Sequence, residues 1–352
     1  MNILRYPKSS DRSLKAWNAS DELIIRTVLE DNVDIEDCIL LHDLFGYLSC
    51  HLNDHKPQAV ITFASQEFSI QKNSENNSCS KIQPKNILEH WTTSKSALMR
   101  IPKSLGLFEF YLARLCEILG KDGVVYCGFM TKYFTPSWLK LAEKYFEEVN
   151  QSLAHKKSRL LILKKPIKSK LNYIESFKDD NDIEWQQYLG VFSSGRIDSA
   201  SRFFMEHLEV PTGDIKVVDV GSGNGVLSKH VQTKNPDAEI HLVDDNSLAT
   251  LSSKLNIKGD QIHHHFSRNL DFLDDNSCDL VISNPPFHFE YELNLDVAFR
   301  TFKDAYRILK KGGELWVVAN NNLAYKPQML KSFDNCVVIA QNRKFNIYRC
   351  KK

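Results

Sequence analysis

The stretch from residue 219 to residue 225, Asp-Val-Gly-Ser-Gly-Asn-Gly, constrains the fold of this 352-residue chain more than any other. It ends an apolar run at 215–220 and precedes a helical pattern at 226–233, so the glycines lie where a strand turns into a helix. Such a turn is typical of open α/β sheets, which bind ligands at the carboxyl edge of their parallel strands. We therefore predict an α/β fold with a parallel sheet.

Strand and helix patterns alternate in both halves of the chain, and the two halves resemble each other. In each half a helix precedes a glycine-containing turn, at 120–123 and 310–313, and a strand follows it. We predict two tandem Rossmann-like domains at 1–176 and 177–352. The first half has only one glycine at 42–46, where the second has three, so we expect the first domain to be degenerate.

Composition limits the possible classes of protein. Hydrophobic residues make up 42% and charged residues 25%, and the net charge is +1, as in ordinary soluble proteins. No apolar run approaches the roughly 20 residues of a membrane helix, and residues 1–8 do not read as a secretory signal. The eight cysteines contain no CxxC pair, so we expect reduced thiols in a cytoplasmic protein.

The glycine turn also predicts the cofactor. Its spacing differs from the GxGxxG pattern of dinucleotide enzymes, and a carboxylate at Asp219 suits a ligand with an amine and a sulfonium better than a pyrophosphate. Asp244 ends the next strand, where it can accept hydrogen bonds from both ribose hydroxyls. The predicted cofactor is S-adenosylmethionine, and Ser267, after the third strand, is a candidate contact to its adenine. The other predicted contacts are Gly221, Gly223, Asn224, Gly225, Asp245 and Asn284.

The acceptor half of the site is predicted at residues 284–287, Asn-Pro-Pro-Phe, which follow the fourth strand. Two prolines cannot continue a strand ladder or a helix, so the Asn284 side chain and the Pro285 carbonyl are free to accept hydrogen bonds from a planar amine. Phe287 would stack on the ring that carries the amine and hold it for in-line displacement. The same tetrapeptide would serve guanine N2, adenine N6 or a protein glutamine.

Two further clusters carry less information. Residues 156–170 hold six lysines and one arginine but no acid, which predicts either a nucleic-acid contact or a solvated surface, with Lys164, Lys165 and Lys168 as the candidate residues. Residues 263–265 are three histidines. Because successive strand residues alternate between faces, the three cannot converge on one ion, and we predict no metal site.

Together, these motifs resemble the ribosomal RNA guanine-N2 methyltransferases. The segments that carry the resemblance in the second half are 192–198 (FSSGRID), 219–225 (DVGSGNG), 243–246 (VDDN), 283–288 (SNPPFH) and 342–345 (NRKF). The first half looks like the large-subunit group of this family at 16–17 (AW), 21–22 (DE), 43–46 (DLFG), 48–50 (LSC), 55–57 (HKP) and 101–103 (IPK).

The resemblance implies a catalytic methyltransferase domain of class I at 177–352, preceded by a degenerate copy that serves RNA binding or folding. It implies methylation of one guanine N2 in 23S ribosomal RNA, with residues 192–198 packed over the cofactor and Asp198 in contact with it. Two alternatives stay open: methylation of 16S ribosomal RNA, and a non-catalytic RNA-binding protein of ribosome assembly. Intact glycines and Asn284 argue against the second.

Overall fold

The computed structural model describes every residue except Ser10, Arg12, Ser169, Phe287 and Asn294. The chain divides into two compact units, Met1–Tyr173 and Ile174–Lys352, beside the boundary at 176/177 expected from the sequence. Each unit is an α/β domain built around a seven-stranded sheet. Among the described residues, no helix is long and apolar enough to cross a membrane.

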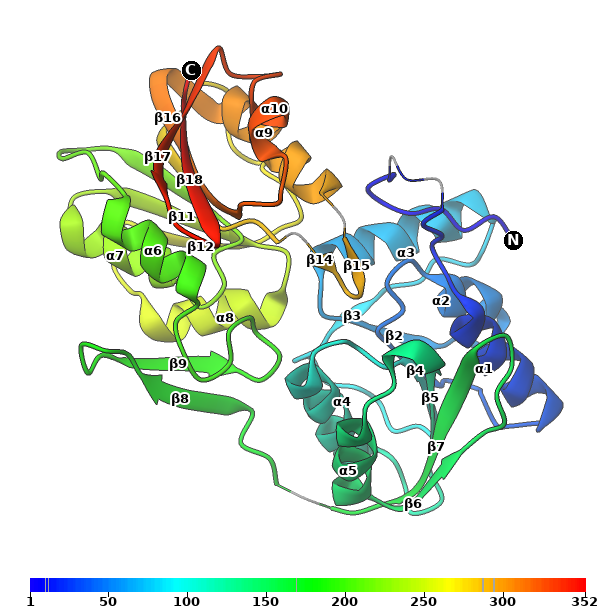
Figure 1. The fold of residues 1–352 in the computed structure, drawn as a ribbon. Coiled ribbons are helices and arrows are strands. Elements are labelled where there is room, and N and C mark those ends of the chain that lie inside the picture. Colours follow the sequence, from blue (N-terminus) through cyan, green and yellow to red (C-terminus); the bar gives the residue numbers. More distant parts are fainter. Residues whose placement is uncertain (10, 12, 169, 287, 294) are drawn as a thin grey trace. The chain divides into compact units, whose positions relative to one another are not determined.

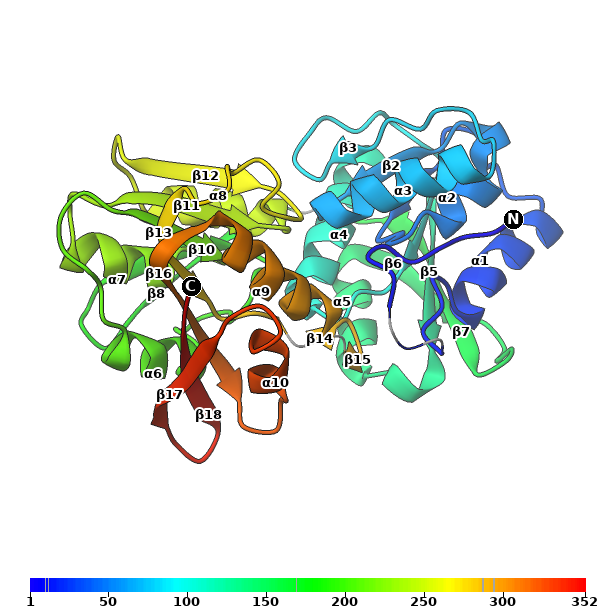
Figure 2. The ribbon, with the colours of Figure 1, turned by 90° about the horizontal axis from the view of Figure 1, so that it is seen from above.

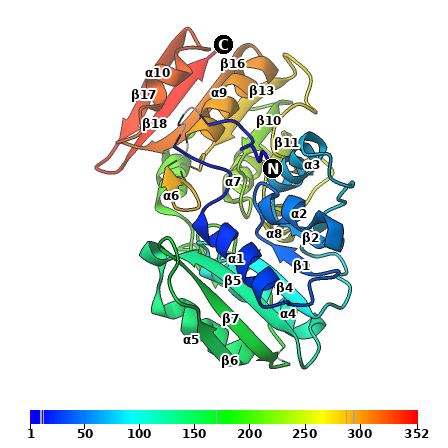
Figure 3. The same ribbon diagram turned by 90° about the vertical axis from the view of Figure 1, so that its right-hand side faces the viewer.

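The N-terminal unit has the sheet order β3-β2-β1-β4-β5-β7-β6. Strands β3 to β5 run parallel, and β7 and β6 add an antiparallel end. Figure 3 shows α1 lying over β5 and β7, where its apolar face joins the core. The elements of the N-terminal unit are α1 (Ala19–Glu30), β1 (Ile39–Leu41), α2 (Tyr47–His51), a 3₁₀ turn (Asn53–His55), β2 (Gln58–Ile61), α3 (Ala64–Asn76), β3 (Lys85–Asn86), β4 (Ser96–Arg100), α4 (Leu105–Ile118), β5 (Val124–Met130), a 3₁₀ turn (Thr131–Tyr133), α5 (Pro136–Tyr145), β6 (Phe146–Gln151) and β7 (Ser158–Pro166).

The C-terminal unit repeats this order as β12-β11-β10-β13-β16-β18-β17. Its elements are β8 (Ile174–Lys178), β9 (Glu184–Tyr188), α6 (Ser199–His207), β10 (Lys216–Val220), α7 (Val226–Lys234), β11 (Glu239–Asp244), α8 (Ser247–Asn256), β12 (Ile262–Phe266), β13 (Cys278–Ser283), β14 (His288–Phe289), β15 (Glu292–Leu293), α9 (Asp296–Ile308), β16 (Leu309–Asn320), α10 (Tyr325–Met329), β17 (Asn335–Gln341) and β18 (Phe345–Lys351). The shared order confirms the predicted tandem α/β fold.

Alternating strand residues of the C-terminal sheet face two separate cores. Val218, Val281 and Val317 face α9 and α10, whereas Val217 and Ile282 face α6 and α7. These helices lie on opposite faces of the sheet in Figure 1. Burial on both faces explains why these parallel strands read as continuous apolar runs.

One prediction from the cysteine pattern is wrong. Cys336 of β17 and Cys350 of β18 are direct partners in the antiparallel register and form a disulfide, with a Cα–Cα distance of 4.1 Å. The other six cysteines are free, as expected. Spacing along the chain could not reveal this pair, because strand pairing brings together residues that are 14 positions apart.

Residues 73–80 are rich in Asn and Ser, a composition typical of exposed loops, but the structure makes the first part of this stretch helical and buries Asn73. Helix α3 continues through Asn76, and the Asn73 side chain is buried. Its amide exchanges hydrogen bonds with the backbone of Leu4 and donates to the Phe45 carbonyl. A polar residue in this stretch therefore holds the N-terminal segment in place instead of facing solvent.

Candidate active site

The glycine turn between β10 and α7 has the left-handed backbone that only glycine adopts without strain. The φ angles of Gly221, Gly223 and Gly225 are +75°, +56° and +89°. The turn is fastened to the neighbouring strand β11, because the N–H groups of Gly221 and Ser222 both donate to the Val243 carbonyl, at 2.8 and 3.2 Å. The predicted strand, turn and helix therefore form one continuous unit.

We expect two glycine substitutions in this turn to differ in their effect on stability. A Cβ at Gly225 would lie 3.3 Å from Ser253 Cβ and 3.4 Å from Leu242 Cδ2, whereas one at Gly223 would meet nothing within 4 Å. Gly223→Ala therefore adds backbone strain alone, about 1–2 kcal/mol, and Gly225→Ala adds about 1–3 kcal/mol of overpacking to that strain. Urea unfolding of the two variants measures the difference; equal losses would contradict this reading of the turn.

Asp219, at the end of β10, is fully buried. Its Oδ2 accepts a hydrogen bond of 2.7 Å from Ser228 Oγ, and its Oδ1 has no hydrogen-bond partner among the described residues. Burial raises the pKa of Asp219 to about 7, and the nearby charge of Asp244 contributes to this shift. An unpartnered buried oxygen of this kind is a candidate acceptor for a ligand N–H. The role of Ser228 was not visible in the sequence.

Asp244 ends β11 and is partly buried at the same sheet edge. Its Oδ2 accepts from the Gly223 N–H and its Oδ1 from the Asn246 N–H, each at 2.8 Å. These two bonds fix the plane of the carboxylate and leave lone pairs on both oxygens. Burial raises its pKa to about 6 despite these bonds. Asp245 follows it at the strand end and is also partly buried.

The Asn284 side chain, just beyond β13, is held from one side. Its Nδ2 donates to Asp198 Oδ2 at 3.3 Å and to Ser201 Oγ at 3.1 Å. A carboxylate only accepts hydrogen bonds, so the Asn284 NH2 group must face Asp198. The Asn284 Oδ1 then points away from Asp198 and is available as an acceptor. Asp198 also caps helix α6 through the N–H groups of Ala200 and Ser201.

The two predicted halves of the site meet at one edge of the sheet. The Ser283 hydroxyl donates to the Val220 carbonyl at 2.7 Å, which ties the ends of β13 and β10 together. A Cβ built on Gly221 would lie 3.9 Å from Pro286 Cδ, so the glycine turn adjoins the proline turn. Pro285 is buried and Pro286 is exposed. Phe287, the predicted stacking residue, lies outside the described residues.

Two predicted contacts have side chains that are engaged elsewhere. Asn224 is buried, and its Nδ2 donates to Gln187 Oε1 of β9 at 3.0 Å. The Ser267 hydroxyl donates to the Asn269 carbonyl at 2.9 Å, and the Ser267 N–H donates to the Asp244 carbonyl. Both residues lie at the correct sheet edge, and in this structure their side chains maintain loops. Gln187 had no distinguishing feature in the sequence.

The corresponding edge of the N-terminal unit is built differently. Asp43 is buried like Asp219, but both the N–H and the hydroxyl of Ser49 donate to its Oδ2, each at 2.7 Å. The only glycine of the turn is Gly46, and Ile101 stands where the second unit has Asn284. The Arg5 guanidinium lies 4.9 Å from the centroid of the Phe45 ring, so the chain's own N-terminal segment lies against this turn.

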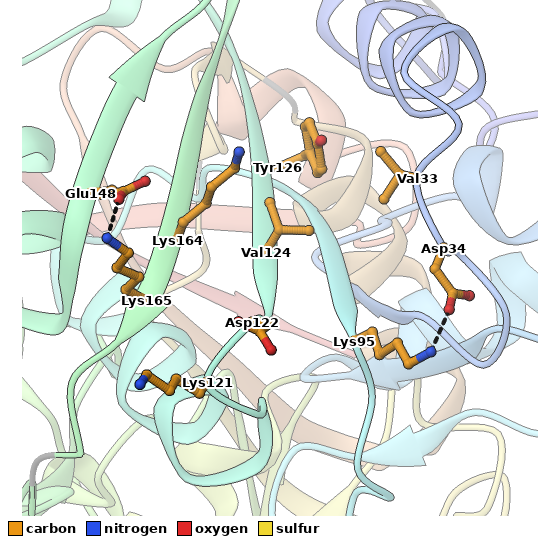
Figure 4. A pocket seen from close by; sticks show the side chains of 10 residues that line it. All are labelled: Val33, Asp34, Lys95, Lys121, Asp122, Val124, Tyr126, Glu148, Lys164 and Lys165. Carbon is orange, nitrogen blue, oxygen red and sulfur yellow. Dashed lines mark hydrogen bonds and ion pairs between the residues drawn. The ribbon is translucent and has the colours of Figure 1, made fainter.

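The N-terminal unit has an open pocket of about 410 Å³ at the start of strands β4 and β5, opposite to the edge just described. Four lysines line it. Lys165 pairs with Glu148 at 2.5 Å and Lys95 with Asp34 at 2.8 Å (Figure 4). Lys164 and Lys121 complete the set of lysines. The predicted lysines Lys164, Lys165 and Lys168 are all exposed.

The chain is similar to known proteins over its whole length. Residues 1–168 match the family described as RLMG N-terminal domain, and residues 182–349 match the Methyltransferase small domain. The Ribosomal RNA large subunit methyltransferase G of Shewanella sp. (strain MR-4) is 32% identical, covering 100% of this chain and 97% of the relative. The protein of that name from Aliivibrio salmonicida (strain LFI1238) is 32% identical, covering 100% and 96%. The chain belongs to the ribosomal RNA large subunit methyltransferase G family.

A solved structure shares the fold of this methyltransferase G family member from end to end. The 16S rRNA N2 G1207 methyltransferase (RsmC) of T. Thermophilus, in complex with AdoMet and guanosine, aligns with a TM-score of 0.78 and 19% identity, covering 100% of this chain and 97% of the other. The similarity confirms the Rossmann-like methyltransferase fold of the two-unit chain. The resemblance inferred from the sequence motifs is confirmed by the family assignment.

Proposed function

We propose that the protein transfers a methyl group from S-adenosylmethionine to the exocyclic N2 of one guanine in 23S ribosomal RNA. The observation that carries this proposal is the arrangement of Asn284, whose amide is fixed by Asp198 next to the glycine turn. Membership of a ribosomal RNA methyltransferase family supports the same reaction class. A ribosomal RNA substrate would place the reaction in the cytoplasm.

The residues at the sheet edge fit the proposed cofactor. The turn at Gly221 and Gly223 leaves room at the end of β10, since a Cβ on Gly223 would meet nothing within 4 Å. Asp219 Oδ1 is available to the cationic methionine end, and the carboxylate of Asp244 to the two ribose hydroxyls. When bound, S-adenosylmethionine supplies an electrophilic methyl group on a sulfonium. Asp198, Asn224, Asp245 and Ser267 line the same edge as further proposed contacts.

The chain's own part in the reaction is to orient the acceptor amine. The lone pair of an exocyclic amine is delocalised into its ring, and acceptors placed on both N–H bonds turn it out of that plane. We assign these acceptor roles to Asn284 Oδ1 and the Pro285 carbonyl, with Phe287 stacking on the base. Because the alkylated nitrogen becomes acidic as it gains charge, water can take the released proton and no strong base is needed.

Cofactor binding should strengthen as pH rises from 6 to 8. The pKa values of Asp219 and Asp244 are raised to about 7 and about 6 by burial, and a cationic ligand prefers both carboxylates ionised. Each proton that binding displaces changes the affinity by up to about tenfold per pH unit. Titration calorimetry at several pH values measures this. A dissociation constant that is the same at pH 6 and pH 8 would contradict the assignment, and Asp219→Asn should flatten the upper part of the profile.

The same two carboxyl groups affect stability in the opposite direction. Their pKa values are raised above the ordinary aspartate value of 3.8, so the folded chain without cofactor holds these protons more tightly than the unfolded chain does. Their contribution to the free energy of unfolding is therefore fully present below about pH 4 and is lost as pH rises to about 7. Cofactor binding at neutral pH compensates by pairing the charges.

RNA recognition is the proposed role of the N-terminal unit, including Lys164, Lys165 and Lys168. Reversing these three charges to Glu should weaken binding of 23S RNA fragments and lower the slope of log affinity against log salt by up to about 3, roughly one for each lost phosphate contact. A matched control reverses three exposed lysines of the other unit, Lys254, Lys258 and Lys331. If both triple variants give the wild-type slope, the lysine cluster is an ordinary surface.

Nucleoside mass spectrometry on RNA from cells lacking the protein tests the proposed substrate. The content of N2-methylguanosine in purified 23S RNA should fall by one residue per molecule, with 16S RNA unchanged. A loss in 16S RNA instead would favour the small-subunit alternative, and no change in either RNA would overturn the proposal. In a duplex one N–H of guanine N2 is paired with cytosine, so the target base must be unpaired or unstacked when it reaches Asn284.

A further inference from the structure

Four polar side chains gather on one face of the C-terminal sheet, at the edge formed by β11 and β12. The parallel register pairs His241 with His263, and residues two apart on a strand share a face, so Glu239 and His265 join them. Figure 2 shows β12 at the outer edge of its sheet. His264 faces the other side, where its Nδ1 lies 2.8 Å from Ser253 Oγ. The partners of these histidines on β11 are not apparent from the three consecutive histidines alone.

The geometry of this group converges on a single point. Glu239 Oε1 lies 2.9 Å from His241 Nε2 and 3.6 Å from His263 Nε2. One ligand atom from each of these three residues falls within 4.8 Å of the others. In a tetrahedral zinc site with bonds of about 2.0–2.1 Å, ligand atoms lie about 3.3–3.4 Å apart. Small side-chain rotations are therefore enough to place all three around one ion.

The surroundings of this group hold His241 in place and leave the group open to solvent. The Nδ1 of His241 is 2.9 Å from His265 Nε2, and the two rings stack. His265 therefore fixes the orientation of the His241 ring through its second nitrogen, as a hydrogen-bond partner does for most metal-ligating histidines. The site is open to solvent, because the side chain of His263 is 41% exposed. Lys216 Nζ lies 3.3 Å from Glu239 Oε1, where it supplies a competing positive charge.

We propose that Glu239, His241 and His263 bind one divalent transition-metal ion of the zinc type, with water in the fourth position. Two imidazoles and one carboxylate are a ligand set that zinc accepts, and three protein ligands leave one coordination site open. The ion would link the edge strand β12 to β11 beneath the strand ends that carry Asp244 and Ser267. This site does not depend on the proposed methyl transfer.

Zinc binding by the full-length protein, freed of any histidine tag, tests the inference. A competition titration against a chromophoric chelator should show one equivalent of Zn²⁺ bound. His263→Gln and Glu239→Gln should each weaken binding at least about tenfold, because each removes one of three ligands. His264→Gln is the matched control on the opposite face and should bind as the wild type does. Lys216→Met should tighten binding, because the competing charge is gone.

Cobalt gives a second readout that does not depend on affinity alone. Co²⁺ in a tetrahedral site absorbs visible light much more strongly than hydrated Co²⁺ does, and this visible band should be present in the wild type and lost in His263→Gln. Melting curves recorded without metal show whether each variant is folded. If His263→Gln does not fold, Glu239→Gln is the variant compared with the wild type. Absence of stoichiometric zinc binding by the wild type overturns the proposal. Equal binding by the wild type and both ligand variants does so as well.

Discussion

Asn284→Ala is expected to lower kcat for methyl transfer by about 10²–10³-fold, because it removes a fixed acceptor that aligns the reacting amine. The amide is already oriented by Asp198 and Ser201, so no reorganisation is needed when the base arrives. The dissociation constant of S-adenosylmethionine should change far less than kcat. Single-turnover transfer of a labelled methyl group to 23S RNA measures the rate separately from binding.

Two variants sharpen the Asn284 prediction. Ser201→Ala removes one of the two hydrogen bonds that orient the amide and leaves Asp198 in place, so a loss of about tenfold is expected, between wild type and Asn284→Ala. Asn335→Ala is the matched control, because Asn335 is exposed on β17. Wild-type turnover in Asn284→Ala would remove this residue from the site.

Asp244→Ala should weaken S-adenosylmethionine binding by at least about 10²-fold. A hydrogen bond to a charged acceptor contributes about 1.5–3 kcal/mol, and the carboxylate offers one oxygen to each ribose hydroxyl. Calorimetric titration measures the loss directly. Asp237→Ala, at an exposed position between α7 and β11, is the control and should bind normally.

Asp244 also holds the glycine turn, so its removal needs a second variant. Its Oδ2 accepts the Gly223 N–H, and alanine would leave that group without its partner. Asp244→Asn keeps one oxygen that can accept the Gly223 N–H but loses the acceptor for the Asn246 N–H. Without cofactor it should therefore melt between Asp244→Ala and the wild type, while still binding the cofactor more weakly than the wild type does. If Asp244→Asn binds as tightly as wild type, the carboxylate is not a ribose contact.

The parts of this molecule that depend on local sequence were predictable. Gly221, Gly223 and Gly225 require positive φ angles, and such residues between an apolar run and a helical pattern specify a strand-turn-helix unit. The position of Asn284 after a buried strand followed from two prolines that end the ladder. Both features are encoded within a few residues, so a reading of the chain in order finds them.

The remaining features depend on contacts between distant parts of the chain. Asp198 and Asn284 are 86 positions apart, and only the packing of α6 against the sheet makes the first the orienting partner of the second. Cys336 and Cys350 became visible as a pair through strand register. The same is true of His241 and His263.

Methylation in vitro by the purified protein tests the proposed reaction and its substrate together. The substrates are 23S and 16S RNA isolated from cells that lack the protein, each supplied with S-adenosylmethionine carrying a labelled methyl group. We predict label in N2-methylguanosine of 23S RNA, at one site per molecule, with labelling by Asn284→Ala slower by about 10²–10³-fold. Label in N6-methyladenosine, in 16S RNA alone or in protein would contradict it.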